Sequence, residues 1–438
     1  MQTVSSFSLV NKHVVVIGMG LTGLSVVRFL LAKQAKVVAM DSRSELMLSL
    51  DIPLFLGELD PDKLCKSDLV VVSPGVNLNN PAIQKAMTSN VQVIGDIELF
   101  AQFNTRPVIA ITGSNGKSTV TQLVADMCTA GGKKVLMGGN IGLPALDLLD
   151  QTADAFVLEL SSFQLETTYS LKPLAATVLN VTEDHLDRHG DMKNYQQLKL
   201  KVFDHCQFAV FNRDDVLAMP ANIQASSTYG LSKCATGFSW DQETACILFD
   251  NQTYLDSQRC LLVGAHNMLN IQAAAALAKA FGIDDASIQQ AAQQFSGLPH
   301  RCQTVAFNNN VRWINDSKAT NVGATLAAIN GLAPQIRGRL ILIAGGEGKG
   351  ADFSKLADCF SQSVDLLITL GKDGDKIAGL HAKSIKVSSI KEAVVAAHKY
   401  SQAGDTVLLS PACASLDMFD NYQHRGECFA QAVRELAA

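Results

Sequence analysis

The residues with the clearest chemical meaning lie at positions 108–119, where a short apolar run leads into a glycine-rich loop. Residues 108–111 are apolar, and the sequence continues Thr-Gly-Ser-Asn-Gly-Lys-Ser-Thr. The glycines let backbone N–H groups turn inward around an anion, and Lys117 adds a positive charge at the outer phosphates. The hydroxyl of Ser118 or Thr119 can ligate Mg²⁺. The loop predicts an ATP site, although the strict motif of the large NTPase class has a glycine where this chain has Ile111.

A second glycine-rich turn, Gly-Met-Gly-Leu-Thr-Gly at positions 18–23, follows the apolar run 13–17, and Asp41 ends the next apolar run. This spacing is typical of dinucleotide-binding folds, in which a pyrophosphate lies on the helix N-terminus and the acid binds a ribose. A nicotinamide-dependent dehydrogenase is one interpretation. Because the same geometry can hold any nucleotide diphosphate, the ATP loop in the next block favours a different ligand.

Potential metal ligands end two further apolar runs. One run ends at Glu159, followed by Ser161, and the other leads into Glu183-Asp184-His185. Parallel sheets bind ligands at the carboxyl ends of their strands, and an acid there can hold Mg²⁺ together with Ser118 or Thr119. We expect Glu159 to be the stronger metal ligand. The glycine-rich stretch 138–142 is either a turn or a second backbone cradle.

The order of apolar runs and helical patterns predicts a parallel α/β architecture in three blocks. Interruptions at Gly95-Asp96 and at Gly297-Leu298-Pro299 divide the blocks. We expect a Rossmann-like N-terminal domain (1–96), a central P-loop ATPase-like domain with a parallel sheet (97–298) and a Rossmann-like C-terminal domain (299–438). Each should have its own core, with the ligand site in a cleft between domains. The expected strands are 13–17, 36–40, 69–72, 91–94, 108–111, 135–137, 155–160, 176–179, 208–211, 311–315, 340–344, 366–370 and 406–409.

The composition limits the class of protein. The chain has 438 residues, of which 47% are hydrophobic and 18% charged, with a net charge of −5. The sequence contains neither a signal-peptide pattern nor an apolar run long enough to span a bilayer, so we expect a cytoplasmic protein without membrane insertion. The negative charge argues against a nucleic-acid partner. The ten cysteines have no zinc-like spacing, which predicts reduced packing residues.

Five motifs in order resemble those of the Mur ligases, the ATP-dependent amide-bond ligases of peptidoglycan synthesis. They lie at positions 112–119, 138–142, 159–165, 180–187 and 264–267. In the third block, residues 315–321 and 410–417, followed by Phe419, Tyr422 and Arg425, resemble the members that add D-glutamate. The resemblance implies that the substrates are UDP-N-acetylmuramoyl-L-alanine, D-glutamate and ATP, joined through an acyl phosphate. It gives each domain one of these ligands, and we expect a monomer.

The resemblance also implies roles for single residues. The expected catalytic residues are Lys117, Glu159, His185 and Lys199. The expected ATP contacts are Gly113, Ser114, Asn115, Gly116, Lys117, Ser118, Thr119, Asn270, Arg301 and Asp316. The expected UDP-sugar contacts are Leu21, Thr22, Asp41, Ser42, Arg43, Ser73, Gly75, Asn140 and Ser161. The expected D-glutamate contacts are Lys318, Thr320, Lys349, Ser415, Leu416 and Tyr422. Two departures from the family pattern are Tyr422, where the family often has Phe, and the stretch 345–349, which varies at Glu347 and Gly348.

One implied feature is a lysine carbamylated by CO₂ that helps to hold a second Mg²⁺. Lys199, four residues after Tyr195, matches the family position, and Lys201 is the alternative, expected at the surface. Carbamylation turns a cation into an oxygen-bearing anion suited to hard metals. The expected metal ligands are Ser118, Thr119, Glu159, His185 and carbamylated Lys199. A nucleotide-regulated binding protein, which would bind ATP without consuming it, is the alternative from a non-enzyme class.

Overall fold

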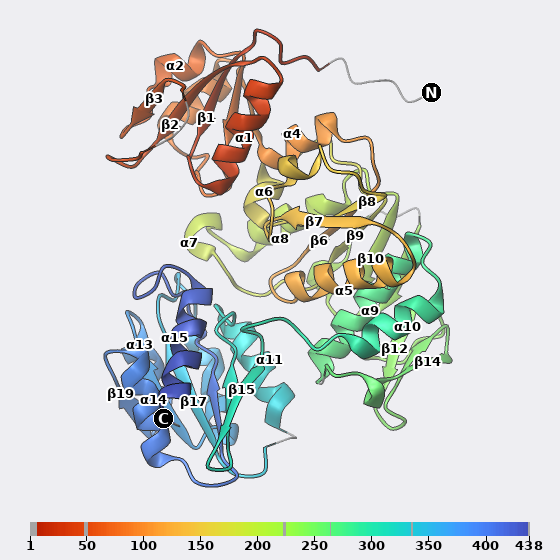
Figure 1. Cartoon of the computed structure of the whole chain (residues 1–438), viewed down its shortest axis with the longest axis vertical. Helices are drawn as coiled ribbons and strands as arrows, with labels where there is room; N and C mark the ends of the chain where they lie inside the picture. Colours follow the sequence, from red (N-terminus) through yellow and green to blue (C-terminus); the bar gives the residue numbers. More distant parts are fainter. Residues whose placement is uncertain (1–6, 48–50, 222–224, 263, 334–335, 437–438) are drawn as a thin grey trace.

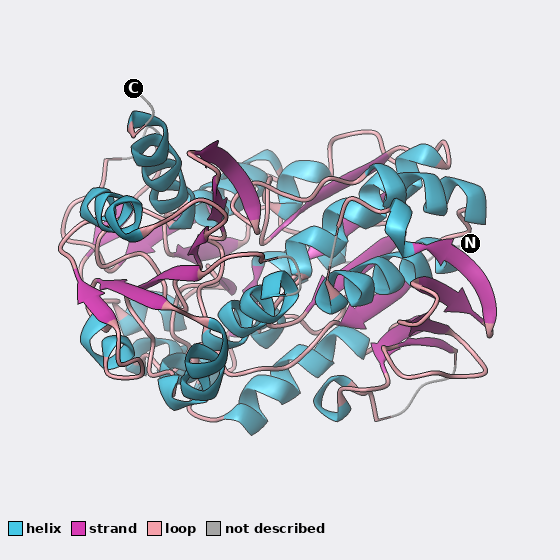
Figure 2. Ribbon diagram, turned by 90° about the horizontal axis from the view of Figure 1, so that it is seen from below, coloured by secondary structure: helices cyan, strands magenta, loops and turns pink. Residues whose placement is uncertain are grey.

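The computed structural model describes residues 7–47, 51–221, 225–262, 264–333 and 336–436. Three large sheets follow one another along the length of the molecule, from the N-terminal strands at one end to the C-terminal strands at the other (Figure 1). Figure 2 shows the same strands from below, with helices packed around them. The predicted α/β class with parallel sheets is therefore confirmed.

The first sheet has five parallel strands in the order β3-β2-β1-β4-β5. They are β1 His13–Ile17, β2 Lys36–Asp41, β3 Leu54–Leu56, β4 Leu69–Val72 and β5 Gln92–Gly95. The helices are α1 Leu21–Ala32, α2 Pro61–Cys65, α3 Pro81–Thr88 and α4 Asp96–Phe103. Because the strand order reverses between β1 and β4, the turns after β2, β1 and β4 gather at one edge, where such sheets bind ligands.

The central sheet has six parallel strands in the order β11-β10-β9-β6-β8-β7. They are β6 Val108–Thr112, β7 Val135–Gly139, β8 Ala155–Glu159, β9 Ala175–Val178, β10 Phe208–Asn212 and β11 Ser226–Tyr229. The α-helices are α5 Lys117–Ala130, α6 Ser162–Glu166, α7 Leu186–His189, α8 Met192–Leu200, α9 Ala265–Ala280 and α10 Asp285–Gln294, with 3-10 turns η1 Ala145–Leu148, η2 Lys201–Phe203 and η3 Val216–Ala218. A small antiparallel sheet of β12 Phe238–Asp241, β13 Cys246–Phe249 and β14 Gln252–Asp256, ending in η4 Ser257–Arg259, packs beside it.

The C-terminal sheet has the order β15-β16-β20-β17-β18-β19, and only the β15–β16 pair is antiparallel within it. Its strands are β15 Gln303–Asn308, β16 Val311–Asn315, β17 Leu340–Gly345, β18 Leu366–Leu370, β19 Ser384–Lys386 and β20 Thr406–Leu409. The helices are α11 Val322–Leu332, α12 Ala357–Ser363, α13 Gly374–Ala378, α14 Ile390–Tyr400 and α15 Tyr422–Glu435, with the 3-10 turn η6 Phe353–Leu356 before α12. The ends of β16, β20 and β17 are neighbours.

Every strand predicted from sequence is present, with ends that differ by at most two residues. The prediction missed β3, β11, β15 and β19, which lie at sheet edges, and it missed the antiparallel sheet. Edge strands lack the continuous apolar pattern of strands buried on both faces. All ten cysteines are free, as expected, although the packing interpretation holds fully only for the buried Cys128, Cys260 and Cys413.

The N-terminal and central sheets share one apolar core, which differs from the expectation of separate cores. A single cluster of buried side chains runs from Val14 and Val16 in β1 through Phe100 in α4 to Phe156 in β8. The rings of Phe100 and Phe156 meet edge to face, with their centroids 5.5 Å apart. Helix α4 thus lies in a packed seam between the two sheets, so side chains in this seam can contact residues of both domains. In the described part of the chain, no helix is long and apolar enough to cross a membrane.

Candidate active site between the central and C-terminal domains

A cavity of about 410 Å³ has walls from the central sheet and from residues 301–328 of the C-terminal domain. Many of the predicted site residues line it: Ser114, Asn115, Gly116, Lys117, Ser118, Thr119, Asn140, Glu159, Ser161, His185, Lys199, Asn270, Arg301, Asp316, Lys318 and Thr320. Most come from strand ends and the loops that follow them, whereas Lys199 lies on α8 and Asn270 on α9. The structure therefore brings the phosphate loop, the expected metal ligands and part of the expected amino-acid site into one space.

The phosphate loop joins β6 to α5. Gly116 has φ of 86°, and a Cβ there would lie 2.6 Å from the Asn270 side-chain oxygen, so this turn needs glycine. Helix α5 begins at Lys117, which places its N-terminal N–H groups and its positive dipole end at the cavity. Lys117 Nζ donates to the carbonyls of Gly113 (2.8 Å) and Ser114 (2.9 Å). Burial lowers the pKa of this amine. The loop is thus preformed around its lysine.

Glu159 is the residue best suited to a metal ion. It is buried, and its Oε1 accepts a hydrogen bond from Asn140 Nδ2 at 2.7 Å. Its Oε2 is buried without a hydrogen-bond partner among the described residues. Burial alone would raise the pKa of the Glu159 carboxyl. The charge of Lys117 and the hydrogen bonds that Glu159 accepts oppose this effect and lower the pKa overall. An anionic carboxylate with one unused oxygen, beside the hydroxyls of the phosphate loop, fits a hard cation such as Mg²⁺.

The described residues hold no cluster of three or more His, Cys, Asp and Glu side chains that could bind a metal without other ligands. A metal ion here would need hydroxyl, phosphate, water or carbamate oxygens in addition to Glu159. That donor set is the usual one for Mg²⁺ at a phosphate loop, because Mg²⁺ binds one or two carboxylates together with substrate phosphates. The side chains present therefore fit the expected metal.

Lys199 lies on α8 and is almost completely buried. Its Nζ donates to Gly113 O at 2.8 Å and lies 4.5 Å from the centre of the Tyr195 ring. Burial, with a further contribution from Lys117, lowers its pKa well below the ordinary value. This favours the neutral amine, the form that can react with CO₂. Lys201 lies outside this cavity, where its Nζ donates to Glu166 O at 3.1 Å. It is half-buried, so it lies only partly at the surface.

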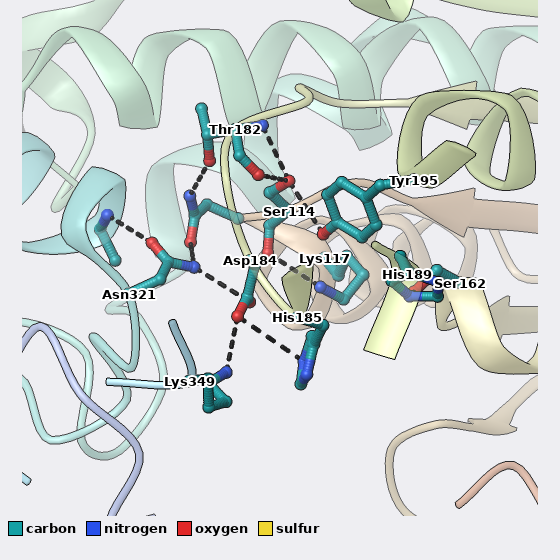
Figure 3. Close-up of polar contacts among 12 residues, drawn as sticks. Ser114, Lys117, Ser162, Thr182, Asp184, His185, His189, Tyr195, Asn321 and Lys349 are labelled. Carbon is teal, nitrogen blue, oxygen red and sulfur yellow. Dashed lines mark hydrogen bonds and ion pairs between the residues drawn. The ribbon is translucent and has the colours of Figure 1, made fainter. Parts of the chain in front are cut away.

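Asp184 connects the central and C-terminal domains (Figure 3). Its Oδ1 lies 2.6 Å from Lys349 Nζ, and its Oδ2 accepts from Asn321 Nδ2 at 3.2 Å. Asn321 Nδ2 also lies 3.1 Å from Asn115 Oδ1 in the phosphate loop. Although burial raises the pKa of Asp184, Lys349 and the neighbouring His185 lower it to about 2. Sequence reasoning gave Asp184 only as a potential metal ligand and assigned no role to Asn321, although both lie in motifs that follow strands.

His185 lies next to this carboxylate, with its Nε2 3.7 Å from Asp184 Oδ1. Its ring meets the Phe163 ring edge to face at 4.9 Å. Burial lowers the pKa of His185 to about 4, despite the opposing effect of Asp184. The imidazole is therefore neutral at physiological pH, so one of its nitrogens carries a lone pair for a metal or a donor.

The C-terminal wall of the cavity carries Lys318 and Thr320. Lys318 Nζ lies 4.0 Å from the centre of the Tyr422 ring. Burial, followed by the charge of Arg301, lowers the pKa of Lys318 to about 7. Asp316, held by Ser410 Oγ at 2.8 Å, has a pKa raised by burial to about 7. Lys318 is therefore only partly protonated near neutral pH, and an anionic ligand bound beside it would favour its protonated form.

Arg425 ties the loops of this wall together. Its guanidinium is buried and donates to the hydroxyl and the carbonyl of Ser317 at 2.9 and 2.8 Å. It also donates to Cys413 O at 3.1 Å. The two loops after β16 and β20 are thus fixed to each other. Ser415 is buried in the second loop, whereas Leu416 is 68% exposed, and both lie outside the lining of the cavity.

The expected UDP-sugar residues fall into two groups. Asn140 and Ser161 line the cavity, whereas the others lie at or just after the ends of β1, β2 and β4 in the N-terminal domain: Leu21, Thr22, Asp41, Ser42, Arg43, Ser73 and Gly75. Asp41 accepts from Met19 N at 2.7 Å and from three N–H groups of Arg43, chiefly the side chain, which lowers the pKa of the carboxyl. Gly23 closes the turn, because a Cβ there would lie 1.8 Å from Gly18 O.

Models of three protein families match this chain in succession. They are "Mur ligase MurD-like, N-terminal domain" over residues 12–95, "Mur ligase middle domain" over 111–278 and "Mur ligase, glutamate ligase domain" over 300–413. A protein of Pasteurella multocida named UDP-N-acetylmuramoylalanine--D-glutamate ligase is 48% identical over 97% of this chain and 98% of its own. A protein of Shewanella oneidensis with the same name is 46% identical over 96% and 98%.

Solved structures resemble the whole fold at low sequence identity. A pseudomurein peptide ligase type C from Methanothermus fervidus is 20% identical, with a TM-score of 0.64 over 98% of this chain and all of that one. A MurF ligase from Thermotoga maritima in complex with ADP is 16% identical, with a TM-score of 0.62 over the full length of both chains. At such identity the likeness supports the three-domain arrangement of the fold.

Proposed function

This chain belongs to the Mur ligase family, and we infer from that membership that it is an ATP-dependent ligase joining UDP-N-acetylmuramoyl-L-alanine to D-glutamate. The reaction forms an amide bond through an acyl phosphate and yields ADP and phosphate, a step in peptidoglycan precursor synthesis. The observation that carries this inference is a cavity lined by the phosphate loop and by Lys318 of the C-terminal domain, with Lys349 bound to the cavity-lining Asp184. Near full-length similarity to ligases of this name supports it.

The proposed ATP site is the phosphate loop together with Asn270, Arg301 and Asp316. The loop N–H groups would bind phosphate oxygens, and Lys117 would exchange the loop carbonyls for the phosphoryl group being transferred. Glu159, with Ser118 or Thr119, would hold Mg²⁺, which supplies neutralisation of phosphate charge. Positive charge from Lys117 and Arg301 acts on the same phosphoryl oxygens. These side chains therefore stabilise charge that grows during transfer.

The proposed UDP-sugar site spans two domains. The turns after β1, β2 and β4 would hold the nucleotide, while Asn140 and Ser161 would guide the sugar end toward the cavity. This arrangement would bring the reactive carboxylate of a long substrate near the phosphate loop and keep its nucleotide away from that loop. The glycine fingerprint then serves a nucleotide diphosphate rather than NAD.

The proposed D-glutamate site uses the C-terminal domain. Lys318 and Thr320 lie on one loop, Lys349 on a second, and Ser415 and Leu416 on a third, with Tyr422 beneath Lys318. Two carboxylates of one ligand need two groups of donors, since a buried carboxylate without partners is unfavourable. Donors that come from separate loops can bind opposite ends of the amino acid.

Carbamylated Lys199 and His185 would add ligands for a second Mg²⁺. Support comes from the burial of Lys199, which favours its neutral amine, and from its position beneath the phosphate loop. We propose in addition that the enzyme is a cytoplasmic monomer, and that its domains divide near residues 96 and 298.

The decisive experiment measures phosphate release with the matching UDP-sugar and each of L-alanine, D-glutamate, L-lysine and meso-diaminopimelate. We expect release with D-glutamate only. A nucleotide-regulated binding protein would bind ATP and release no phosphate in any mixture. A dehydrogenase would bind NAD or NADP tightly by calorimetry, whereas we expect UDP and not NAD to protect the N-terminal domain from proteolysis.

A further inference from the structure

Asp96 is an acidic residue in the apolar seam between the N-terminal and central domains. It begins α4 and is 2% exposed, and the following residues Ile97, Leu99 and Phe100 are buried in the shared core. Its Oδ2 accepts a hydrogen bond from Gln164 Nε2 at 3.0 Å, while its Oδ1 has no partner among the described residues. Burial raises the pKa of this carboxyl to about 6. Such a group is unfavourable for folding, so its position calls for another explanation.

The partner of Asp96, Gln164, belongs to the capping box at the start of α6. Gln164 Oε1 accepts from Ser161 N at 3.1 Å and lies 3.3 Å from Ser161 Oγ. Ser161 Oγ in turn accepts from Gln164 N at 3.2 Å. Ser161 lines the active-site cavity, whereas Gln164 and Asp96 lie behind it. A short chain of hydrogen bonds therefore runs from the domain seam to the cavity wall.

The direction of this chain depends on Asp96. A glutamine amide has one acceptor end and one donor end, and the two ends have nearly the same shape. An ionised carboxylate only accepts, so it holds the NH₂ end of Gln164 toward the seam and the oxygen end toward Ser161. If the amide turned over, its NH₂ would face the Ser161 N–H, and two donors would oppose each other. Ser161 N would then lose its acceptor, and only the hydrogen bond from Gln164 N would hold the Ser161 side chain.

We propose that Asp96 is a positioning residue for the UDP-sugar site, acting through Gln164 on Ser161. It touches no reacting atom. It fixes the direction of the Gln164 amide, and that amide fixes the cavity-lining serine that would contact the sugar substrate. The inference rests on the proposed function, because it concerns affinity for the UDP-sugar. It also explains why an acid remains in an apolar seam where an aliphatic side chain would pack more favourably.

The first test compares Asp96→Ala with Asp96→Asn in steady-state assays of phosphate release. The asparagine variant would keep an oxygen that accepts from Gln164, so KM for the UDP-sugar should stay within about twofold of wild type. Asp96→Ala should raise that KM by about tenfold, as expected for one disrupted hydrogen bond. KM for ATP, KM for D-glutamate and kcat should change by less than about threefold. A uniform change in all three KM values, or none, would overturn the proposal.

The second test reverses the pair. Gln164→Glu places a carboxylate oxygen where the amide nitrogen now lies, 3.0 Å from Asp96 Oδ2. The repulsion between the two carboxylates should raise KM for the UDP-sugar strongly. Combining it with Asp96→Asn restores one carboxylate and one amide. In that double variant the introduced asparagine would donate to the introduced glutamate, whose carboxylate would still accept from Ser161 N. The double variant should therefore recover a KM near wild type.

A double variant no better than Gln164→Glu alone would contradict the orienting role, because a simple packing role predicts no such recovery. This comparison also decides the matter if Asp96→Ala fails to fold. Failure of the proposed function would look different: the wild-type enzyme itself would release no phosphate with the UDP-sugar and D-glutamate.

Discussion

The ionisation of Asp96 should lower the stability of the enzyme in a pH-dependent way. Its pKa rises from an ordinary 3.8 to about 6 in the folded state, and burial is the main cause. The folded state thus holds this proton more tightly than the unfolded state. Below pH 3.8 the carboxyl is protonated in both states and has no effect. As pH rises through the window from 3.8 to about 6, the unfolded state releases the proton first and gains stability relative to the folded state.

The size of the effect follows from the two pKa values. Above about pH 6 the folded state is less stable by about 3 kcal/mol than it would be with an unshifted carboxyl, and about half of this change falls between pH 5 and pH 8. Asp96→Asn removes the titration. The variant places its amide NH₂ group at the unpaired Oδ1 position. The protonated carboxyl of wild type also has an unpaired polar group there, so this cost is similar in the two proteins. The useful quantity is therefore the pH dependence of the difference between the two proteins.

We would measure thermal or urea unfolding of wild type and Asp96→Asn from about pH 5 to pH 8. The variant should gain about 1.5 kcal/mol of unfolding free energy relative to wild type across this range. Because the chain has several domains, the first transition should be followed, and calorimetry should check how many transitions occur. Parallel curves for the two proteins at all pH values would refute the assignment of a buried, titrating carboxylate.

Three further predictions concern the active site. Lys117→Ala should lower turnover by orders of magnitude while the protein stays folded, since it removes a charge directed at transferring phosphoryl oxygens; near-normal turnover would contradict the ATP site. Activity should fall in enzyme stripped of bicarbonate at mildly acidic pH and return when bicarbonate is added. Lys199→Ala should abolish activity, whereas the matched control Lys201→Ala should keep it. The reverse result for the two variants would show that Lys201, and not Lys199, is the carbamylated lysine. Lys318→Ala should raise KM for D-glutamate much more than KM for ATP, and D-glutamine should be a poor substrate in initial-rate assays because a cationic donor loses its partner; efficient use of L-glutamate would point to another member of the family.

Strands buried on both faces were predictable because their apolar runs are continuous. The run Leu69–Val72 is apolar and buried throughout, and it matches β4 in full. Edge strands such as Ser384–Lys386 pair on one side only and need no such run, so their pattern is weak. The shared core between the first two sheets was also missed, since a sequence shows apolar residues but not which neighbours they meet.

The candidate site was predictable where its residues follow strands within one motif. Lys117, Glu159 and His185 were found in this way, and they line one cavity. The contact of Lys349 with Asp184 was not found, because it joins residues 165 positions apart on two domains. The chain from Asp96 to Ser161 was missed for the same reason. Interactions that depend on how domains pack leave no local pattern in the sequence.

The contact between Lys349 and Asp184 has a consequence for substrate selection. If Lys349 binds a carboxylate of D-glutamate, as proposed, then the enzyme's own carboxylate already occupies that lysine at 2.6 Å before the amino acid arrives. A tethered group competes at a high effective concentration, so an incoming acid must displace an internal rival rather than water. A ligand that contributes a single weak contact would lose this competition. The competition would therefore favour dicarboxylates, because their second carboxylate can bind donors on the other loops while the first displaces Asp184 from Lys349.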